Sequence, residues 1–177
     1  MDESFADLTL DGLPEPRLGE DLALRLEGLD ALREHSVRLI SQARQQVCIQ
    51  TPDLEGPLYD QADVEAAFKR LLLGNPRHQV RILLGDSTLA LRQGHRLVAL
   101  AQRLTSNLLI RRPPLEQRPD GACLLVDDLA LLRRTNVAVP NGFVRYGDRA
   151  AVKVQRQEFD RLWSISQPDP ELRRMLL

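Results

Sequence analysis

The chain has 177 residues and a formal net charge of −1, with 43% hydrophobic and 28% charged residues. This length and composition are typical of one globular domain with its own core. No apolar run reaches the roughly 18 residues of a membrane-spanning helix, and the acidic start MDESFADL lacks the basic and apolar regions of a signal peptide, so we expect a cytoplasmic protein.

Residues 1–26 contain several glycine and proline breakers, and we expect an irregular arm in which FADLTL forms a short edge strand. From Leu26 onwards, apolar residues three and four positions apart predict a helix that leads into a strand at 47–51. The pattern then predicts helices over about 60–73, 88–104 and 150–166, strands over 79–86, 107–112, 122–128, 129–135 and 142–147, and a final turn that begins with Asp169 as the N-cap.

Early alternation of helices and strands, followed by a run of strands, indicates an α/β fold with a mixed β-sheet flanked by helices. We divide the chain into an acidic arm, 1–26, and an α/β domain, 27–177. Cys48 and Cys123 lie in apolar strand-like runs without metal-ligand spacing, so both are interpreted as buried thiols. Nucleotide-loop and metal-hydrolase motifs are absent, and we expect neither a metal nor a cofactor.

The charge is unevenly distributed along the chain. Residues 1–34 carry ten acidic residues and three arginines, a net charge of −7, and the rest of the chain therefore carries +6. A solvated acidic tail is the simpler interpretation. The alternative is an arm that lies against the body and competes with anions for its arginines.

The stretch RPDGACLLVDD, residues 118–128, places an apolar strand between acidic residues. Asp120 and Ala122 precede Asp127 by seven and five positions, and Thr135 follows in the stretch RTNVA. This spacing and the order of elements resemble one half of a phospholipase D superfamily protein, whose motif is H-x-K-x4-D followed by G-S-x-x-N. The strand QVRILLGD and the helix segment EFDRLW also resemble that family.

The resemblance implies a reaction in which one histidine attacks phosphorus, a lysine neutralises the phosphoryl oxygens and the aspartate orients a histidine ring. Here Asp120 stands at the histidine position and Ala122 at the lysine position, whereas Asp127 is retained and Thr135 replaces the serine. A carboxylate without a neighbouring lysine is repelled by an anionic diester. We therefore expect no catalytic residue and interpret the site as inactive; a strand that merely ends in acids is the structural alternative.

Arginines gather around these positions and predict a ligand site, because guanidinium groups suit phosphate recognition. The predicted ligand-binding residues are Arg112, Arg118, Arg133 and Arg134. Few aromatic residues accompany them, which weakens the prediction of nucleic acid as the ligand. None of the histidines, His35, His78 and His95, lies in a triad-like pattern.

The leading hypothesis is a non-catalytic phospholipase D-like domain that binds a phosphate-containing ligand or a protein partner. The family resemblance implies a homodimer, since single-motif members pair their half-sites, and a GNAT-type acetyltransferase as a partner. The second hypothesis is a phosphodiesterase with a rearranged site that uses Asp120, Asp127 or His95.

Overall fold

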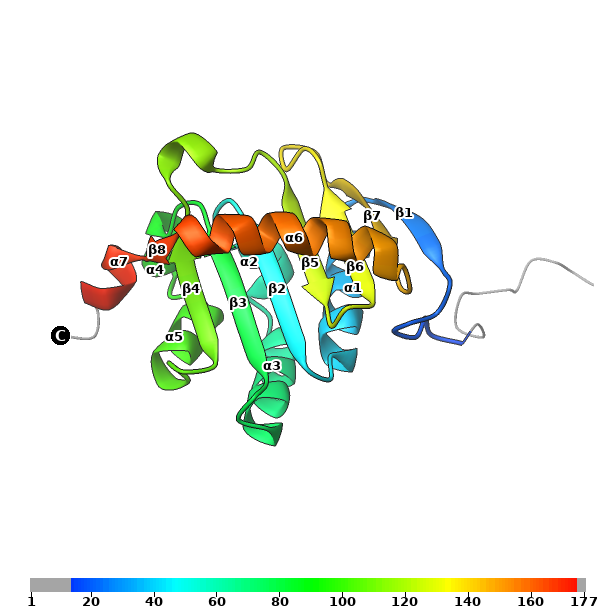
Figure 1. Ribbon diagram of the computed structural model, residues 1–177, viewed down its shortest axis with the longest axis horizontal. Coiled ribbons are helices and arrows are strands. Elements are labelled where there is room, and N and C mark those ends of the chain that lie inside the picture. The colour runs from blue at the N-terminus through cyan, green and yellow to red at the C-terminus, as the bar shows by residue number, and fades with distance from the viewer. Residues whose placement is uncertain (1–13, 175–177) are drawn as a thin grey trace, which may run out of the picture.

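A mixed β-sheet of eight strands organises residues 14–174, the part of the chain that the computed structural model describes (Figure 1). The strands follow the spatial order β1-β7-β6-β5-β2-β3-β4-β8. In chain order the elements are β1 (Ala23–Glu27), α1 (Leu29–Gln42), β2 (Gln46–Thr51), α2 (Gly56–Tyr59), α3 (Ala62–Gly74), β3 (Gln79–Leu84), α4 (Thr88–Gln93), α5 (Arg96–Arg103), β4 (Leu108–Arg112), a 3-10 turn (Leu115–Gln117), β5 (Ala122–Val126), β6 (Ala130–Arg134), β7 (Asn141–Arg145), α6 (Arg149–Ile165), β8 (Gln167–Pro168) and α7 (Pro170–Arg174).

The sheet has a parallel half and an antiparallel half. β2, β3 and β4 run parallel, and the helices between them form the crossover connections that parallel strands require. β5, β6, β7 and β1 pair antiparallel, and β5 joins the two halves by pairing with β2. The predicted α/β fold with a mixed, helix-flanked sheet is therefore confirmed.

Successive residues of the central strands enter different cores, because side chains alternate across a sheet. Val47 and Ile49 pack into the larger core under α1, α3 and α5, whereas Cys48 packs into a smaller core under α6. Figure 1 shows α6 crossing one face of the sheet while α1, α3 and α5 lie behind it. α6 buries Phe159 and Leu162 against the smaller core.

Two predicted helices differ from the structure. The helix predicted over 88–104 is two helices, because Gly94 adopts a left-handed conformation that ends α4 and the His95 side chain accepts a hydrogen bond from the Leu97 N–H to cap α5. The first helix begins at Leu29 rather than Leu26, after Gly28 with a φ of 87°.

The segment predicted as an arm contributes to the sheet at its end. β1 pairs with β7 from Ala23↔Arg145 to Glu27↔Asn141, so residues 23–26 belong to the sheet. The predicted FADLTL strand lies outside the described residues. Asp169 Oδ1 accepts the Glu171 N–H at 2.9 Å, which confirms the predicted N-cap of the final helix. Within residues 14–174, no helix is long and apolar enough to cross a membrane.

Candidate functional site

The topology gathers several strand ends at one edge of the sheet. β2, β3 and β4 are parallel, so their carboxyl ends meet there, and β5 begins at the same edge because Cys123 lies opposite Gln50 of β2. β6 ends beside this start, with Arg134 opposite Ala122. We call this the motif edge, defined by the strand-end residues Thr51, Leu84, Arg112, Ala122 and Arg134.

A hollow of about 370 Å³ opens at the motif edge and contains most of the predicted site residues. Asp120, Ala122, Thr135, Arg133 and Arg134 all line it. Asp120 and Thr135 are exposed, whereas Ala122 is only 6% exposed, so the lysine position of the motif is enclosed by neighbouring side chains. Five of the eight predicted residues are thus brought together.

Asp127 lies at the opposite end of β5 from these residues, roughly 20 Å from Asp120 by the rise of an extended chain. Its carboxylate accepts three backbone N–H groups, from Arg44 at 3.1 Å, Gln45 at 2.8 Å and Gln46 at 3.0 Å. These bonds hold the connection between α1 and β2 against the β5–β6 turn. The contacts of the Asp127 carboxylate are thus with backbone N–H groups of this connection, and its implied role of orienting a histidine ring stays a prediction.

Arg134 occupies the space beside the lysine position and is held there by the chain itself. Its side chain is 5% exposed and forms an ion pair with Glu55. The same guanidinium donates to the carbonyl oxygens of Val137 at 2.8 Å and Val139 at 3.3 Å. Burial raises the pKa of Glu55, although Arg134 acts in the opposite direction. Arg134 thus already has internal partners, and its ligand-binding role stays a prediction.

The loop that carries Glu55 has strained backbone. Leu54 and Glu55 have φ values of 69° and 27°, which residues other than glycine rarely adopt. The Leu54 N–H donates to Thr51 Oγ1 at 3.2 Å, and His95 Nε2 lies 3.1 Å from the Leu54 carbonyl oxygen. Such strain persists only when the surroundings enforce it. Sequence reasoning missed Glu55, and the only signal was its place in the loop after the strand at 47–51.

The other three predicted arginines differ in what they contact. Arg112 lies 3.9 Å from Asp169 Oδ1, away from the hollow. Arg118 is half-buried and lines a neighbouring hollow of about 180 Å³ beside Asp86. Within residues 14–174, neither Arg118 nor Arg133 forms an ion pair or a side-chain hydrogen bond, and Arg133 is exposed. Of the four predicted arginines, these two have no charged partner among the described residues.

Possible nucleophiles near the hollow are poorly suited to reaction. Cys123 lines it, but burial raises the pKa of its thiol to about 12, so the thiolate is scarce at neutral pH. His95 is buried, and its two ring nitrogens contact the Leu54 carbonyl oxygen and the Leu97 N–H. His35 contacts the Tyr146 hydroxyl at 2.7 Å, and His78 contacts the Leu71 carbonyl oxygen. None of the three histidines lines the hollow.

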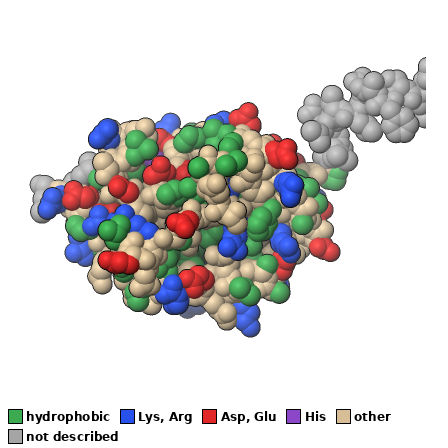
Figure 2. Space-filling model, turned by 90° about the horizontal axis from the view of Figure 1, so that it is seen from above, with side chains coloured by type: hydrophobic (Ala, Val, Ile, Leu, Met, Phe, Trp, Pro, Cys, Tyr) green, Lys and Arg blue, Asp and Glu red, His purple; other side chains and the backbone are tan. Residues whose placement is uncertain are grey.

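The surface around the motif edge has mixed charge. Figure 2 views the molecule from above this edge and shows Lys and Arg side chains interspersed with Asp and Glu side chains and with hydrophobic ones. Among the described residues, no group of three or more His, Cys, Asp or Glu side chains could hold a metal ion.

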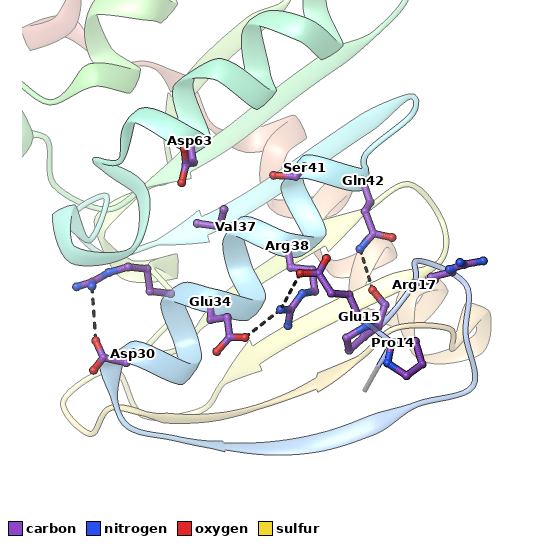
Figure 3. Close-up of a pocket in the computed structure, with 12 residues that line it drawn as sticks. Pro14, Glu15, Arg17, Asp30, Glu34, Val37, Arg38, Ser41, Gln42 and Asp63 are labelled. Atoms are coloured by element: carbon purple, nitrogen blue, oxygen red, sulfur yellow. Dashed lines mark hydrogen bonds and ion pairs between the residues drawn. The ribbon is translucent and has the colours of Figure 1, made fainter. Parts of the chain in front are cut away.

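A larger hollow, about 790 Å³, lies away from the motif edge, between residues 14–17 and α1. Figure 3 shows Arg38 of α1 between two acids, and Arg38 Nη2 lies 2.9 Å from Glu34 and 3.8 Å from Glu15. Gln42 Nε2 donates to the Pro16 carbonyl oxygen at 2.9 Å. The described end of the acidic arm is thus attached to α1 by polar contacts.

Residues 28–175 match the family model described as a domain of unknown function, DUF7931. The chain belongs to the DUF7931 family. The matched range contains the motif edge, Glu55 and Asp127, but not β1. No curated protein matches this DUF7931 chain.

Solved structures show which fold the DUF7931 domain has. It superimposes on Nuc from Salmonella typhimurium, a phospholipase D family member, with a TM-score of 0.59 and 12% identity over 84% of this chain and 99% of Nuc. NucT from Helicobacter pylori gives a TM-score of 0.56 at 9% identity, over 85% of this chain and 99% of NucT. The predicted phospholipase D-like fold is therefore confirmed.

TrmBL2, an archaeal chromatin protein whose structure shows a mode of DNA binding, gives a TM-score of 0.62 at 14% identity over 83% of this chain. The DUF7931 chain spans 54% of the length of TrmBL2. At these identities the likeness concerns the fold alone.

Proposed function

We propose that this protein is a non-catalytic phospholipase D-like domain that acts by binding at the motif edge. The observation that carries the proposal is the Arg134–Glu55 ion pair beside Ala122. The family reaction needs a cation free to neutralise phosphoryl charge at the lysine position. Here that position is an enclosed alanine, and the adjacent guanidinium is already neutralised by a carboxylate of the same chain.

The alternative, a phosphodiesterase with a rearranged site, needs Asp120, Asp127 or His95 to act on one phosphorus atom. Asp120 and Asp127 lie at opposite ends of β5, and His95 is 1% exposed. General acid–base groups must come within hydrogen-bond reach of the reacting atoms. The arrangement therefore favours binding over catalysis.

Hydrolysis of bis(p-nitrophenyl) phosphate tests the proposal. We expect no turnover by the full-length protein between acidic and neutral pH. Asp120→Ala and Asp128→Ala form the matched pair of variants, since both acids are exposed and only Asp120 lines the hollow. A rate that persists in Asp128→Ala and disappears in a folded Asp120→Ala contradicts the non-catalytic function.

For the ligand, a phosphate-containing molecule fits Arg118 and Arg133, the two predicted arginines without internal partners in residues 14–174. DNA binding by TrmBL2, which has a similar fold, supports the same class of ligand. Titration with a labelled single-stranded oligonucleotide at low and high salt measures this binding, which should weaken as salt rises.

Arg133→Ala and Arg118→Ala should each reduce the oligonucleotide affinity and the salt dependence. Arg77→Ala removes the same charge from an exposed position before β3, at the opposite edge of the sheet, and serves as the control. Equal affinities for Arg133→Ala and Arg77→Ala contradict phosphate binding at the motif edge.

The partner predictions also belong to this proposal. A homodimer is supported by the phospholipase D-like fold, in which the resemblance implies paired half-sites. Light scattering that gives a 20.0 kDa particle at micromolar concentrations contradicts the dimer. Co-expression with a GNAT-type acetyltransferase from the same cell, followed by co-purification, tests the second predicted partner.

A further inference from the structure

A second hollow, also about 370 Å³, lies at the opposite side of the molecule from β1, where α5, β4 and the segment 168–173 meet. Its walls are largely aliphatic, with Val98, Leu108, Ile110 and Leu172 among them. We call it the β4 groove. It shares no lining residue with the hollow at the motif edge.

Two residues that line the β4 groove each have a buried polar atom without a hydrogen-bond partner within residues 14–174. Asp169 is 2% exposed, and its Oδ2 atom has no donor. Its other oxygen, Oδ1, accepts the Glu171 N–H and lies 3.9 Å from Arg112. Gln102 Nε2, on α5, is also buried and has no acceptor. A buried polar atom without a partner destabilises the fold, so such atoms indicate a missing partner.

The groove also runs beside an open part of the sheet. β3 pairs with β4 from Leu108 to Arg111, but β8 pairs on the other side only with Arg111 and Arg112. β8 has two residues and ends at Pro168, which has no N–H for further pairing. Among the described strands, Leu108–Ile110 therefore have a neighbour on one side only. An edge strand of this kind can pair with an added strand.

We propose that the β4 groove binds an extended peptide segment of a partner protein. The segment lies along Leu108–Ile110 and places an aliphatic side chain in the hollow. One of its N–H groups donates to Asp169 Oδ2, and one of its carbonyl oxygens accepts from Gln102 Nε2.

A peptide is the ligand class that the groove fits because it supplies the donor, the acceptor and the apolar side chain within one residue. Backbone pairing provides affinity in such complexes, and the side-chain pocket provides specificity. This inference concerns a different surface from the motif edge and does not depend on the function proposed there.

N-acetyl-leucine N-methylamide is the smallest probe with all three features. We expect its titration into the 15N-labelled full-length protein to shift, in a saturable way, the side-chain amide signal of Gln102 and the backbone amide signals of Leu108–Ile110. N-methylacetamide, which has no side chain, and 4-methyl-2-pentanone, which has the isobutyl group but no N–H, should bind more weakly.

Matched variants test whether the probe binds in the β4 groove. Ala101 lines the hollow on α5, whereas Ala99 on the same helix is exposed. Ala101→Leu should fill the groove and abolish binding, and Ala99→Leu should leave it unchanged. Gln102→Met and Asp169→Asn each remove one hydrogen-bonding atom at nearly constant size, and each should weaken binding by about 3- to 10-fold.

Melting temperatures of all variants verify that they fold. The proposal is overturned by the absence of saturable shifts at the groove signals in the unaltered protein, or by equal binding to folded Ala101→Leu and Ala99→Leu. Equal affinity for 4-methyl-2-pentanone also overturns it, because the groove is then an apolar small-molecule pocket without peptide recognition.

Discussion

The two ends of β5 differ in what their acidic residues do. At the amino end, Asp120 is exposed, and Arg134, which lines the same hollow, forms a buried ion pair with Glu55. At the carboxyl end, Asp127 is 6% exposed and accepts three backbone N–H groups. Asp127 has a φ of 51°, a left-handed conformation that aspartate tolerates better than most residues.

The two ends of one motif can therefore have separate roles, one in stabilising the fold and one at the site. Asp127 holds the α1–β2 connection to the β5–β6 turn, and this contact stabilises the fold whether or not the other end reacts. The chemistry that the resemblance implies belongs to positions 120 and 122 at the other end of β5, near the Arg134–Glu55 ion pair. Asp127 by itself is therefore evidence of the fold.

The largest effect is expected from breaking the buried ion pair at the amino end. Arg134→Met leaves the Glu55 carboxylate buried without its cation and should lower the free energy of unfolding by about 3 kcal/mol at neutral pH. Because burial raises the pKa of Glu55, the loss should shrink as the pH falls and that carboxyl becomes protonated. Urea denaturation across pH measures both effects.

The double variant Arg134→Met with Glu55→Gln is the control for that experiment, since it removes both charges and should recover much of the lost stability. If Arg134→Met alone costs less than about 1 kcal/mol, the ion pair is not a buried structural contact.

The next largest effect is expected at the carboxyl end. Asp127→Ala removes the acceptor of three backbone N–H groups and should cost about 2–3 kcal/mol. Asp128→Ala changes the exposed neighbour in the same turn, and Asp120→Ala changes the exposed acid at the other end; both should stay within about 0.5 kcal/mol. Comparable losses in Asp127→Ala and Asp120→Ala would remove the distinction between the two ends.

Introducing the histidine and lysine of the family motif should have a smaller effect on stability, and we expect it to produce no activity. Ala122→Lys places a second cation in an enclosed position opposite Arg134 and should cost about 1–3 kcal/mol. Asp120→His, at an exposed position, should be nearly neutral. Thermal melting and bis(p-nitrophenyl) phosphate hydrolysis check the single variants and the double variant. Turnover by a stable double variant contradicts the view that Arg134 and Glu55 block the site.

A moderate pH effect should arise from His95, which supports the loop that carries Glu55. Burial lowers the pKa of His95, so the unfolded chain binds a proton more readily than the folded one. Stability should therefore fall as the pH drops through the unfolded value of 6.5. His95→Asn keeps a side chain able to cap α5 but does not titrate, and its stability should depend less on pH in this window. Urea denaturation gives the free energy of unfolding of both proteins between about pH 7.5 and 5.5. If it depends on pH as strongly in His95→Asn as in the unaltered protein, this role of His95 is contradicted.

The smallest effect is expected from shortening the acidic arm. Removing residues 2–13 deletes four acidic residues and no basic ones, and it leaves β1 in place. If the arm competes for the arginines of the motif edge, the shortened protein should bind the oligonucleotide slightly more tightly at low salt, with a gain that vanishes at high salt. Equal affinities at low salt end the competition hypothesis.

Much of the fold was predictable from the sequence, because burial imposes a pattern on each element separately. Apolar runs such as QVRILL and ACLLV identify central strands, and the three- and four-residue spacing of Phe159, Leu162 and Trp163 identifies a helix with one buried face. The motif spacing also identified the phospholipase D-like fold, since it reflects the length of one strand and its ends. The short strands β1 and β8 were not predicted because two to five residues at a sheet edge carry little apolar pattern.

The chemistry of the site was decided only by tertiary structure. Nothing in the sequence links Glu55 to Arg134, which are 79 positions apart and meet because β2 and β6 both end at the motif edge. The need for glycine at position 121 also depends on tertiary structure, since a Cβ atom there would lie 2.6 Å from the carbonyl oxygen of Arg134 on the neighbouring strand. Local patterns determine which residues are buried, but the partner of a buried charge depends on which distant segments the sheet brings together.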